Sequence, residues 1–395
     1  MRSRTIQKNA LAFLLPSRRR VGEALGSEGE IRLGIAAPGE YVVGNALRKG
    51  HDCGMEATSV TPGQIGRRWL ITGGCGFIGS NLIRMLLKDG LASSIRILDD
   101  LSVGQLATVE NFSPVEPLRV PREMSDRGLV EFVETSITGN VTKWVKGAEI
   151  VVHLAANTGV QPSVKAPRLD MEKNVVGTLN MLEAARDTGV ACFIFASSGA
   201  PTGNVEPPIH EEVPCHPLSP YGASKLAGEG YCSAYYWSYG LRTVALRFSN
   251  VYGPWSTHKG SLVALFLRQA FLGQPWTING DGAQTRDFIY VDDLVRAIIA
   301  SAGFEGGGEI FQIATGRETS VRDVAELLAH RLWKDLGVRA QYQSGPALNG
   351  DMKRNYASIS KARRLLGWEP RVGLEEGIAQ TIRWYDLHKT ALSKL

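Results

Sequence analysis

The chain has few cysteines and no pattern that would give them a structural task. Its 395 residues include five cysteines, none in a Cys-x-x-Cys pair: Cys53, Cys75, Cys192, Cys215 and Cys232. An odd and scattered set argues against a disulfide framework and against a structural zinc site, and it favours a reducing compartment. We therefore expect a cytoplasmic protein without a bound metal.

Long apolar and long basic stretches are also missing. No run approaches the ~20 apolar residues that a membrane-spanning helix requires, and the longest basic block is Arg18–Arg20. The net charge of +5 is small for a chain of 395 residues. These absences argue against a membrane protein and against a nucleic-acid-binding protein. The 44% of hydrophobic and 21% of charged residues are typical of a globular chain with ample material for a core.

The first 66 residues differ in composition from the rest. The first 22 carry six basic residues and no acidic one, and a mixed, glycine-containing stretch follows. An organelle presequence has such a composition, and so does a disordered extension. We expect residues 1–66 to be a poorly ordered N-terminal extension and assign no function to them.

A glycine-rich stretch separates an apolar run from a helical pattern. The apolar run Trp69–Ile71 is typical of a strand that is buried on both faces. Gly73, Gly76 and Gly79 follow, and then apolar residues at helical spacing. Glycines in this order permit a tight turn, close approach of a pyrophosphate to the backbone, and close packing of the helix on the sheet. The stretch therefore predicts a dinucleotide-binding turn with phosphates at the helix N-terminus.

An acidic residue follows at the distance that this interpretation requires. The segment Ile95–Asp100 is a second predicted strand, and Asp99 lies 20 residues beyond Gly79. A carboxylate at this position accepts hydrogen bonds from the adenosine ribose. Because the same charge would repel a 2′-phosphate, the sequence favours NAD over NADP.

Strands and helices alternate along most of the remaining chain. Further strands are expected over residues 130–133, 149–156, 191–195 and 243–248, with helices over residues 169–186 and 219–239. This alternation predicts an α/β fold of the Rossmann type, a doubly wound parallel sheet. We expect residues 67–250, together with about 287–312, to form the nucleotide-binding domain. Residues 251–286 and 313–395 are expected to form a smaller C-terminal α/β lobe that binds the substrate.

A second motif, Tyr221-Gly-Ala-Ser-Lys225, brings a phenol and an ammonium onto one face of a predicted helix. An ammonium beside a phenol favours the phenolate, so we expect a Tyr221 pKa moved from about 10 toward neutrality. Tyr221 then becomes a candidate general base. Ser198, which follows the strand expected over residues 191–195, is a candidate partner for the reacting oxygen.

Taken together, these motifs resemble the extended short-chain dehydrogenase/reductases, and within them the NAD-dependent sugar-nucleotide epimerase/dehydratase group. The resemblance runs from about residue 68 to residue 380. The segments that carry it are Thr72–Gly79, Leu98–Ser102, His153–Ala156, Asn174–Thr178, Tyr221–Lys225, Leu246–Pro254, Arg286–Asp293 and Leu365–Trp368.

The resemblance implies roles for individual residues. It assigns catalysis to Ser198, Tyr221 and Lys225. NAD-binding residues would be Gly73, Gly76, Phe77, Ile78, Gly79, Asp99, Asp100, Ser136, Ile137, Leu154, Ala155, Ala156 and Asn174, with Tyr221 and Lys225. A nucleotide-sugar substrate, with a UDP-sugar as the first choice, would contact Ser198, Asn250, Ser261, Arg286, Asp351 and Asn355. Relatives also use the helix that carries Tyr221 in a four-helix dimer interface, which implies a homodimer.

The residue after the catalytic serine separates reactions within this group. Dehydratases and decarboxylases of the group resemble one another in placing Asp or Glu there, whereas this chain has Gly199. Because glycine cannot protonate a leaving group, we expect epimerisation at C4 of UDP-glucose and UDP-galactose, or of their N-acetylated pair. The open alternatives are epimerisation of UDP-glucuronate, another nucleotide-sugar epimerase or dehydratase, and a non-catalytic NAD-binding regulator.

Several positions depart from the pattern of the group. Thr202 lies where relatives have Tyr, Ser136 replaces an Asp that contacts adenine, and Leu348 replaces an Arg that binds the diphosphate. Arg286 would then bind the diphosphate alone or with help from Arg354. At Asn355, relatives with a large Tyr exclude an N-acetyl group, so the smaller Asn leaves room for one.

Overall fold

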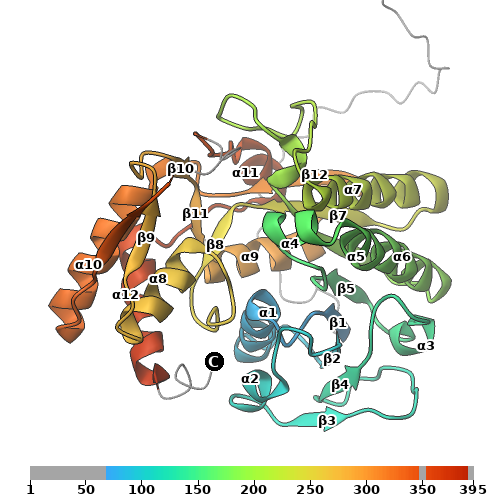
Figure 1. Cartoon of the computed structure of the whole chain (residues 1–395). Coiled ribbons are helices and arrows are strands. Elements are labelled where there is room, and N and C mark those ends of the chain that lie inside the picture. Colours follow the sequence, from blue (N-terminus) through green and yellow to red (C-terminus); the bar gives the residue numbers. More distant parts are fainter. Residues whose placement is uncertain (1–67, 347–352, 390–395) are drawn as a thin grey trace, which may run out of the picture. The chain divides into compact units, whose positions relative to one another are not determined.

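The computed structural model describes residues 68–346 and 353–389. Their largest element is an eight-stranded sheet whose neighbouring strands all run parallel (Figure 1). The strand order is β12-β7-β6-β5-β1-β2-β4-β3. The strands are β1 (Arg68–Thr72), β2 (Ser94–Asp99), β3 (Val115–Pro117), β4 (Val130–Glu134), β5 (Ile150–His153), β6 (Cys192–Ser198), β7 (Thr243–Phe248) and β12 (Glu309–Ile313).

The central strands are apolar because helices cover both faces of the sheet. Successive residues of β1 alternate between the faces, so that Trp69 and Ile71 enter one core while Leu70 enters the other. All three side chains are fully buried. This alternation explains why the strand is apolar between Arg68 and Thr72.

Helices from distant parts of the chain cover the first face. Helix α1 contacts α9, and α9 contacts α11 and strands β6 and β7. The bounds are α1 (Phe77–Lys88), α9 (Val291–Ala302) and α11 (Ser360–Leu366); the short α2 (Leu106–Glu110) lies beside α1. Burial of the apolar side of α1 against this core holds its first turn next to the end of β1.

A second group of helices covers the opposite face. It consists of α3 (Thr142–Val145), α4 (Val160–Lys165), α5 (Pro167–Met171), a π-helical turn η1 (Glu172–Val176), α6 (Gly177–Asp187) and α7 (Pro220–Tyr239). Helix α7 packs on β6 and β7 and contacts α4, α5 and α6. A short 3₁₀ turn, η2 (Ala200–Thr202), links β6 toward α7.

The C-terminal part forms a smaller lobe with its own apolar core, seen at the left of Figure 1. Helix α10 packs against α8 and α12. The lobe and its links contain β8 (Asn250–Tyr252), α8 (Leu262–Phe271), β9 (Trp276–Asn279), β10 (Thr285–Arg286), β11 (Phe288–Tyr290), β13 (Thr319–Ser320), α10 (Val321–Leu336), β14 (Tyr342–Gly345) and α12 (Leu374–Leu387). These strands form three separate two-stranded pairs, β8 with β11, β9 with β14 and β10 with β13.

The strand order reverses between β1 and β5. After β1 the chain builds outward through β2, and it then returns to place β5 on the other side of β1. Ligands of doubly wound sheets bind in the crevice at the carboxyl ends of the strands that flank such a reversal. The glycine-rich turn after β1 lies at this point.

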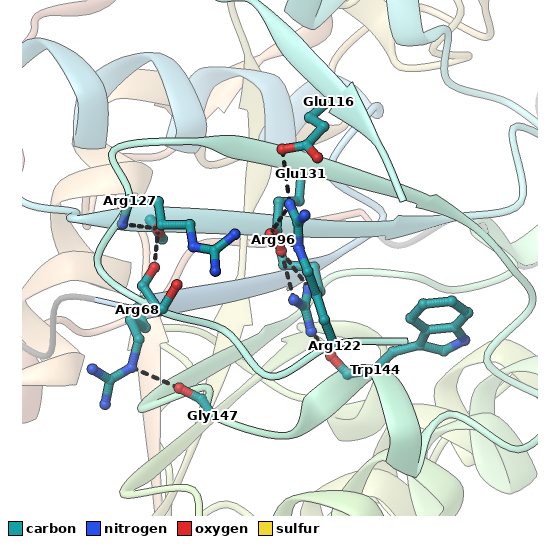
Figure 2. A network of polar contacts seen from close by, with 10 residues as sticks. Arg68, Arg96, Glu116, Arg122, Arg127, Glu131, Trp144 and Gly147 are labelled. Atoms are coloured by element: carbon teal, nitrogen blue, oxygen red, sulfur yellow. Dashed lines mark hydrogen bonds and ion pairs between the residues drawn. The ribbon is translucent and has the colours of Figure 1, made fainter. Parts of the chain in front are cut away.

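A buried polar network joins the strands on the β2 side of the sheet (Figure 2). Glu131 of β4 accepts from Arg96 Nε at 2.7 Å and from Arg122 Nε at 2.9 Å. Arg96 also donates to the carbonyl of Trp144, and Arg122 pairs with Glu116 of β3. The Arg96 side chain is fully buried, so Glu131 is its counter-ion inside the protein.

The α/β fold of the Rossmann type predicted from the sequence is confirmed. The strands expected from the sequence did not include β3, which pairs with β4 at the edge of the sheet. The helix expected over residues 169–186 is interrupted by η1, and the strand expected to reach Ala156 ends at His153. No helix of the described residues is long and apolar enough to cross a membrane. The extension expected over residues 1–66 lies outside the described part of the chain.

Candidate active site

The turn after β1 is shaped by glycines that no larger residue could replace without a shift. Gly73 has a φ of +69°, and a Cβ there would lie 2.8 Å from the Ala155 backbone nitrogen. A Cβ on Gly79 would lie 2.5 Å from the Gly73 carbonyl oxygen. Helix α1 begins after Gly76, and no side chain caps its first amide groups. Its N–H groups are therefore available to a phosphate.

Asp99 at the end of β2 stabilises this turn through hydrogen bonds. Its carboxylate accepts from the backbone nitrogens of Cys75 at 3.0 Å and Leu101 at 2.9 Å. Burial raises the pKa of Asp99, and these two N–H donors oppose the rise. Asp100 is more exposed and pairs with Lys173 at 2.5 Å, which lowers the pKa of Asp100 against the effect of its own burial.

A chain of hydrogen bonds fixes the loop after β5. His153 lies between the hydroxyls of Thr178 at 3.1 Å and Thr72 at 2.8 Å. Thr72 in turn accepts from the backbone nitrogen of Ala155. Burial, aided by the Lys225 charge, lowers the pKa of His153 to about 3, so the imidazole is neutral. The histidine is therefore a packed structural group.

These elements surround a cleft of ≈ 1550 Å³ at the carboxyl ends of the central strands. Most of the residues predicted for the site line it: Gly73, Gly76, Phe77, Ile78, Gly79, Asp99, Asp100, Ile137, Leu154, Ala155, Ala156, Ser198, Tyr221, Lys225, Asn250, Ser261, Arg286 and Asn355. The volume exceeds that of an ordinary small-molecule site, which leaves room for a dinucleotide and a second ligand.

Three predicted residues are not part of the described cleft wall. Ser136 bonds the hydroxyl of Thr138 at 2.9 Å on the surface, although its neighbour Ile137 lines the cleft. Asn174 is buried behind the wall, where its side chain holds both backbone groups of Asn157. Asp351 lies outside the described residues.

The three residues predicted to be catalytic lie on two elements that pack together. Ser198 ends β6, and Tyr221 is in the first turn of α7. The local sequence starts this helix firmly, because Ser219 caps it and Pro220 occupies its first position. A hydrogen bond links the Ser198 hydroxyl with the Tyr221 phenol. Lys225 follows one turn later with its Nζ 5.9 Å from the centre of the Tyr221 ring.

The pKa expected for Tyr221 was wrong in direction. Burial raises the pKa of Tyr221 to about 12, and the bond from Ser198 lowers it only in part. The Lys225 ammonium donates instead to the Ala196 carbonyl at 2.9 Å, so it does not contact the phenol oxygen directly. Burial lowers the pKa of Lys225 to about 8, against the charges of Asp170 and Glu229.

The sequence reasoning missed two buried carboxylates, one on α5 that binds α7 and one on α7 itself. Asp170 accepts from the Ser224 hydroxyl at 2.7 Å and from the Asn174 side chain. Glu229 forms a buried pair with Arg247 of β7 at 2.7 Å. Ser224 and Glu229 stand on either side of Lys225 along the helix, but their partners are distant in the chain, so no local pattern pointed to them.

The departures from the family pattern have structural accounts where the chain is described. Thr202 is fully buried and donates to the Gly199 carbonyl at 2.7 Å, so it holds the turn after Ser198. Arg354 pairs with Glu318 and Glu206 and does not line the cleft. The help from Arg354 considered for Arg286 is therefore absent from this arrangement. Leu348 lies outside the described residues.

Comparisons with known proteins agree on one family. The model of the NAD dependent epimerase/dehydratase family matches residues 69–314. The chain is similar to a UDP-glucose 4-epimerase of Mycolicibacterium smegmatis, with 37% identity over 80% of this chain and 98% of the relative. It is 34% identical to a UDP-glucuronate 4-epimerase of Thermodesulfobacterium geofontis, over 80% of this chain and 95% of the relative.

A solved structure of a UDP-glucose 4-epimerase from Thermus thermophilus in complex with NAD superposes with a TM-score of 0.69. The two sequences are 35% identical, and the match covers 81% of this chain and 99% of the other.

Proposed function

Because the chain belongs to the NAD dependent epimerase/dehydratase family, we propose that it inverts the C4 hydroxyl of a UDP-sugar through a transient 4-keto intermediate. The observation that carries this proposal is the position of Ser198, Tyr221 and Lys225 in the same cleft as the glycine-rich turn. A hydroxyl, a phenol and an ammonium beside a dinucleotide-binding turn are the groups that reversible oxidation of an alcohol requires.

The turn after β1 fits the pyrophosphate of NAD, the cofactor of this family. Gly73 and Gly79 leave space that a Cβ would fill. Asp99 lines the same cleft, and we assign it to the adenosine ribose. Leu154, Ala155 and Ala156 also line the cleft and would contact the nicotinamide side of the cofactor. Bound NAD would supply a hydride acceptor and donor at the sugar carbon, and its cationic ring would favour the phenolate form of Tyr221.

Proton transfer falls to Tyr221. As the phenolate, Tyr221 takes the proton of the C4 hydroxyl while the carbonyl forms, and as the phenol it gives the proton back when the alcohol is restored. The Ser198 hydroxyl, which is close enough to the phenol to lower its pKa, would hold the same sugar oxygen. Lys225 follows one helical turn later, with its Nζ 5.9 Å from the centre of the Tyr221 ring. Because burial raises the pKa of Tyr221 with Lys225 already in place, the phenolate needs further positive charge, which the bound cofactor would supply.

Gly199 favours epimerisation over dehydration. It follows Ser198 directly, and the space where its side chain would project is open. Among the described residues the carboxylates that line the cleft are Asp99 and Asp100. Both are engaged, one with the glycine-rich turn and one with Lys173. Elimination of a sugar hydroxyl needs an acid beside the reacting carbons, and the described wall offers none there.

The direct test uses purified protein without added NAD, incubated separately with UDP-glucose, UDP-N-acetylglucosamine and UDP-glucuronate. We expect a C4 epimer by chromatography and proton NMR, with no net change in nicotinamide absorbance. Tyr221→Phe should reduce turnover by about 10²–10⁴-fold while NAD stays bound. Dehydration products, or turnover that survives Tyr221→Phe, would contradict the proposal.

The substrate proposal includes the N-acetylated sugars. Asn355 lines the cleft, and we assign it to the side of the sugar's C2 substituent, where a side chain smaller than Tyr would leave space. Comparable turnover of the plain and the acetylated UDP-sugars would support this assignment. If only acetyl-free sugars react, and Asn355→Gly then admits acetylated ones, Asn355 is a barrier and the assignment is wrong.

We also propose a homodimer in the cytoplasm. Large hydrophobic side chains are exposed on α4 and near the end of α7, among them Val164 and Trp237, with Trp237 77% exposed. Exposed side chains of this kind on helices that contact one another favour a protein interface. Light scattering at micromolar concentration should give twice the mass of one chain, and Trp237→Ser should shift the population toward monomers. A monomeric wild-type protein would refute this part.

A further inference from the structure

The cleft contains a positive charge that nothing in the described structure neutralises. Four cationic side chains line its wall: Lys173, Lys225, Lys259 and Arg286. Lys173 pairs with Asp100, Lys225 donates to a backbone carbonyl, and Arg286 donates to the carbonyl of Thr285. The Lys259 ammonium has neither a hydrogen bond nor an ion pair with any described residue, and its contact is the ring of Phe77 at 5.5 Å.

The backbone around Lys259 is held in place, although its ammonium is not. Arg268 donates to the carbonyl oxygens of Thr257 at 2.6 Å and of Lys259 at 3.4 Å. The Lys259 nitrogen donates to the Ser256 carbonyl, and the Ser256 hydroxyl bonds Tyr385 of α12. The loop is thus tied to the lobe on two sides, so Lys259 is presented to the cleft from a fixed position.

The surroundings favour an anion rather than a neutral ligand. Phe77, which the ammonium contacts, is the first residue of α1, where the helix presents uncapped N–H groups. Two residues beyond Lys259, Ser261 precedes α8 with a buried hydroxyl that has no described partner. Burial lowers the pKa of Lys259, and no carboxylate within residues 68–346 and 353–389 opposes this. A bound anion would remove that cost by supplying the missing counter-charge.

We propose that Lys259 is a diphosphate-binding residue, whose ammonium pairs with the phosphate oxygens of a ligand that lies between the first turn of α1 and the start of α8. The inference rests on the proposed function for the presence of such ligands. The diphosphate belongs either to the UDP-sugar or to NAD. Lys259 would supply a second cation in the cleft that Arg286 also lines, a task that Arg354 does not perform because Glu318 and Glu206 engage it.

The test measures binding, so it does not depend on turnover. Calorimetry with UDP, and the NAD content of the protein as purified, would be compared for the wild type, Lys259→Met and Lys259→Arg. Lys88→Met is the matched control, because it removes the same charge from the exposed opposite end of α1. Loss of a charge-assisted hydrogen bond should weaken binding by about 10- to 100-fold, with Lys259→Arg retaining most of the affinity.

Each outcome decides the proposal. Weaker UDP binding in Lys259→Met, with a smaller salt dependence, assigns the ammonium to the substrate diphosphate. Loss of retained NAD assigns it to the cofactor pyrophosphate, and this result holds even if the wild type binds no UDP and the proposed function fails. UDP affinity and NAD content that both match those of Lys88→Met would overturn the proposal.

Discussion

Replacing Glu131 with Gln should destabilise the protein strongly, although the site lies away from the catalytic residues. Glu131 is 5% exposed and accepts hydrogen bonds from Arg96, which is fully buried, and from Arg122 (Figure 2). The Glu131→Gln change keeps the shape of the side chain and removes its charge. The Arg96 guanidinium then stays in the core without a counter-ion, with only neutral acceptors such as the amide oxygen of the introduced glutamine and the Trp144 carbonyl.

The expected loss follows from this geometry. Removing one member of a buried ion pair typically costs about 3–5 kcal/mol, because the other charge is left uncompensated. Domains are stable by only about 5–15 kcal/mol, so the variant should lose a large share of its free energy of unfolding. Arg122 contributes less to the loss, since its side chain is 31% exposed and can turn toward water.

Urea denaturation followed by circular dichroism, at saturating NAD, measures this loss. Glu116→Gln is the matched control: it removes the other carboxylate that binds Arg122, but Glu116 is exposed, so stability should hardly change. The double variant Arg96→Met with Glu131→Leu should recover most of the stability, because no buried charge remains. A loss below about 1 kcal/mol for Glu131→Gln, or a double variant no more stable than the single one, would refute this account.

Two further predictions concern the site itself. Gly79→Ala should cost about 1–3 kcal/mol of stability and reduce NAD retention, since its Cβ would lie 2.5 Å from the Gly73 carbonyl oxygen; unchanged values for both would contradict the close packing at this turn. Lys225→Met should remove turnover and also alter the pH dependence of stability. In the folded protein the pKa of Lys225 is lowered to about 8. Between pH 8 and the higher pKa of Lys225 in the unfolded chain, the unfolded state therefore binds more protons than the folded state. The free energy of unfolding of the wild type should then increase with pH relative to that of the variant. From pH 8 to 9.5 this gain should be about 2 kcal/mol, and a difference in unfolding free energy that is constant over this range would disprove the burial of a titrating ammonium.

Local patterns in the sequence determined the elements that use short-range chemistry. The glycine spacing after Trp69–Ile71 predicted the turn and helix α1, and Ser219-Pro220 predicted the start of α7. In both places the physical requirement lies within a few residues: backbone freedom at Gly73, and a side-chain oxygen and a fixed φ at the helix start. The Rossmann-type sheet followed from the alternation of apolar strands and helices, which needs no knowledge of contacts.

Only the tertiary structure decided the electrostatics of the site. The pair spacing of Tyr221 and Lys225 suggested a lowered phenol pKa, but burial raises it, and the ammonium is bound to the Ala196 carbonyl. Burial depends on what packs around a group from β6 and the helices beside α7, which are far apart in the chain. For the same reason no local pattern pointed to Lys259, whose ammonium has no hydrogen bond or ion pair within the described residues. Which charges lack a partner is a property of the whole fold, because a counter-ion can come from any part of the chain.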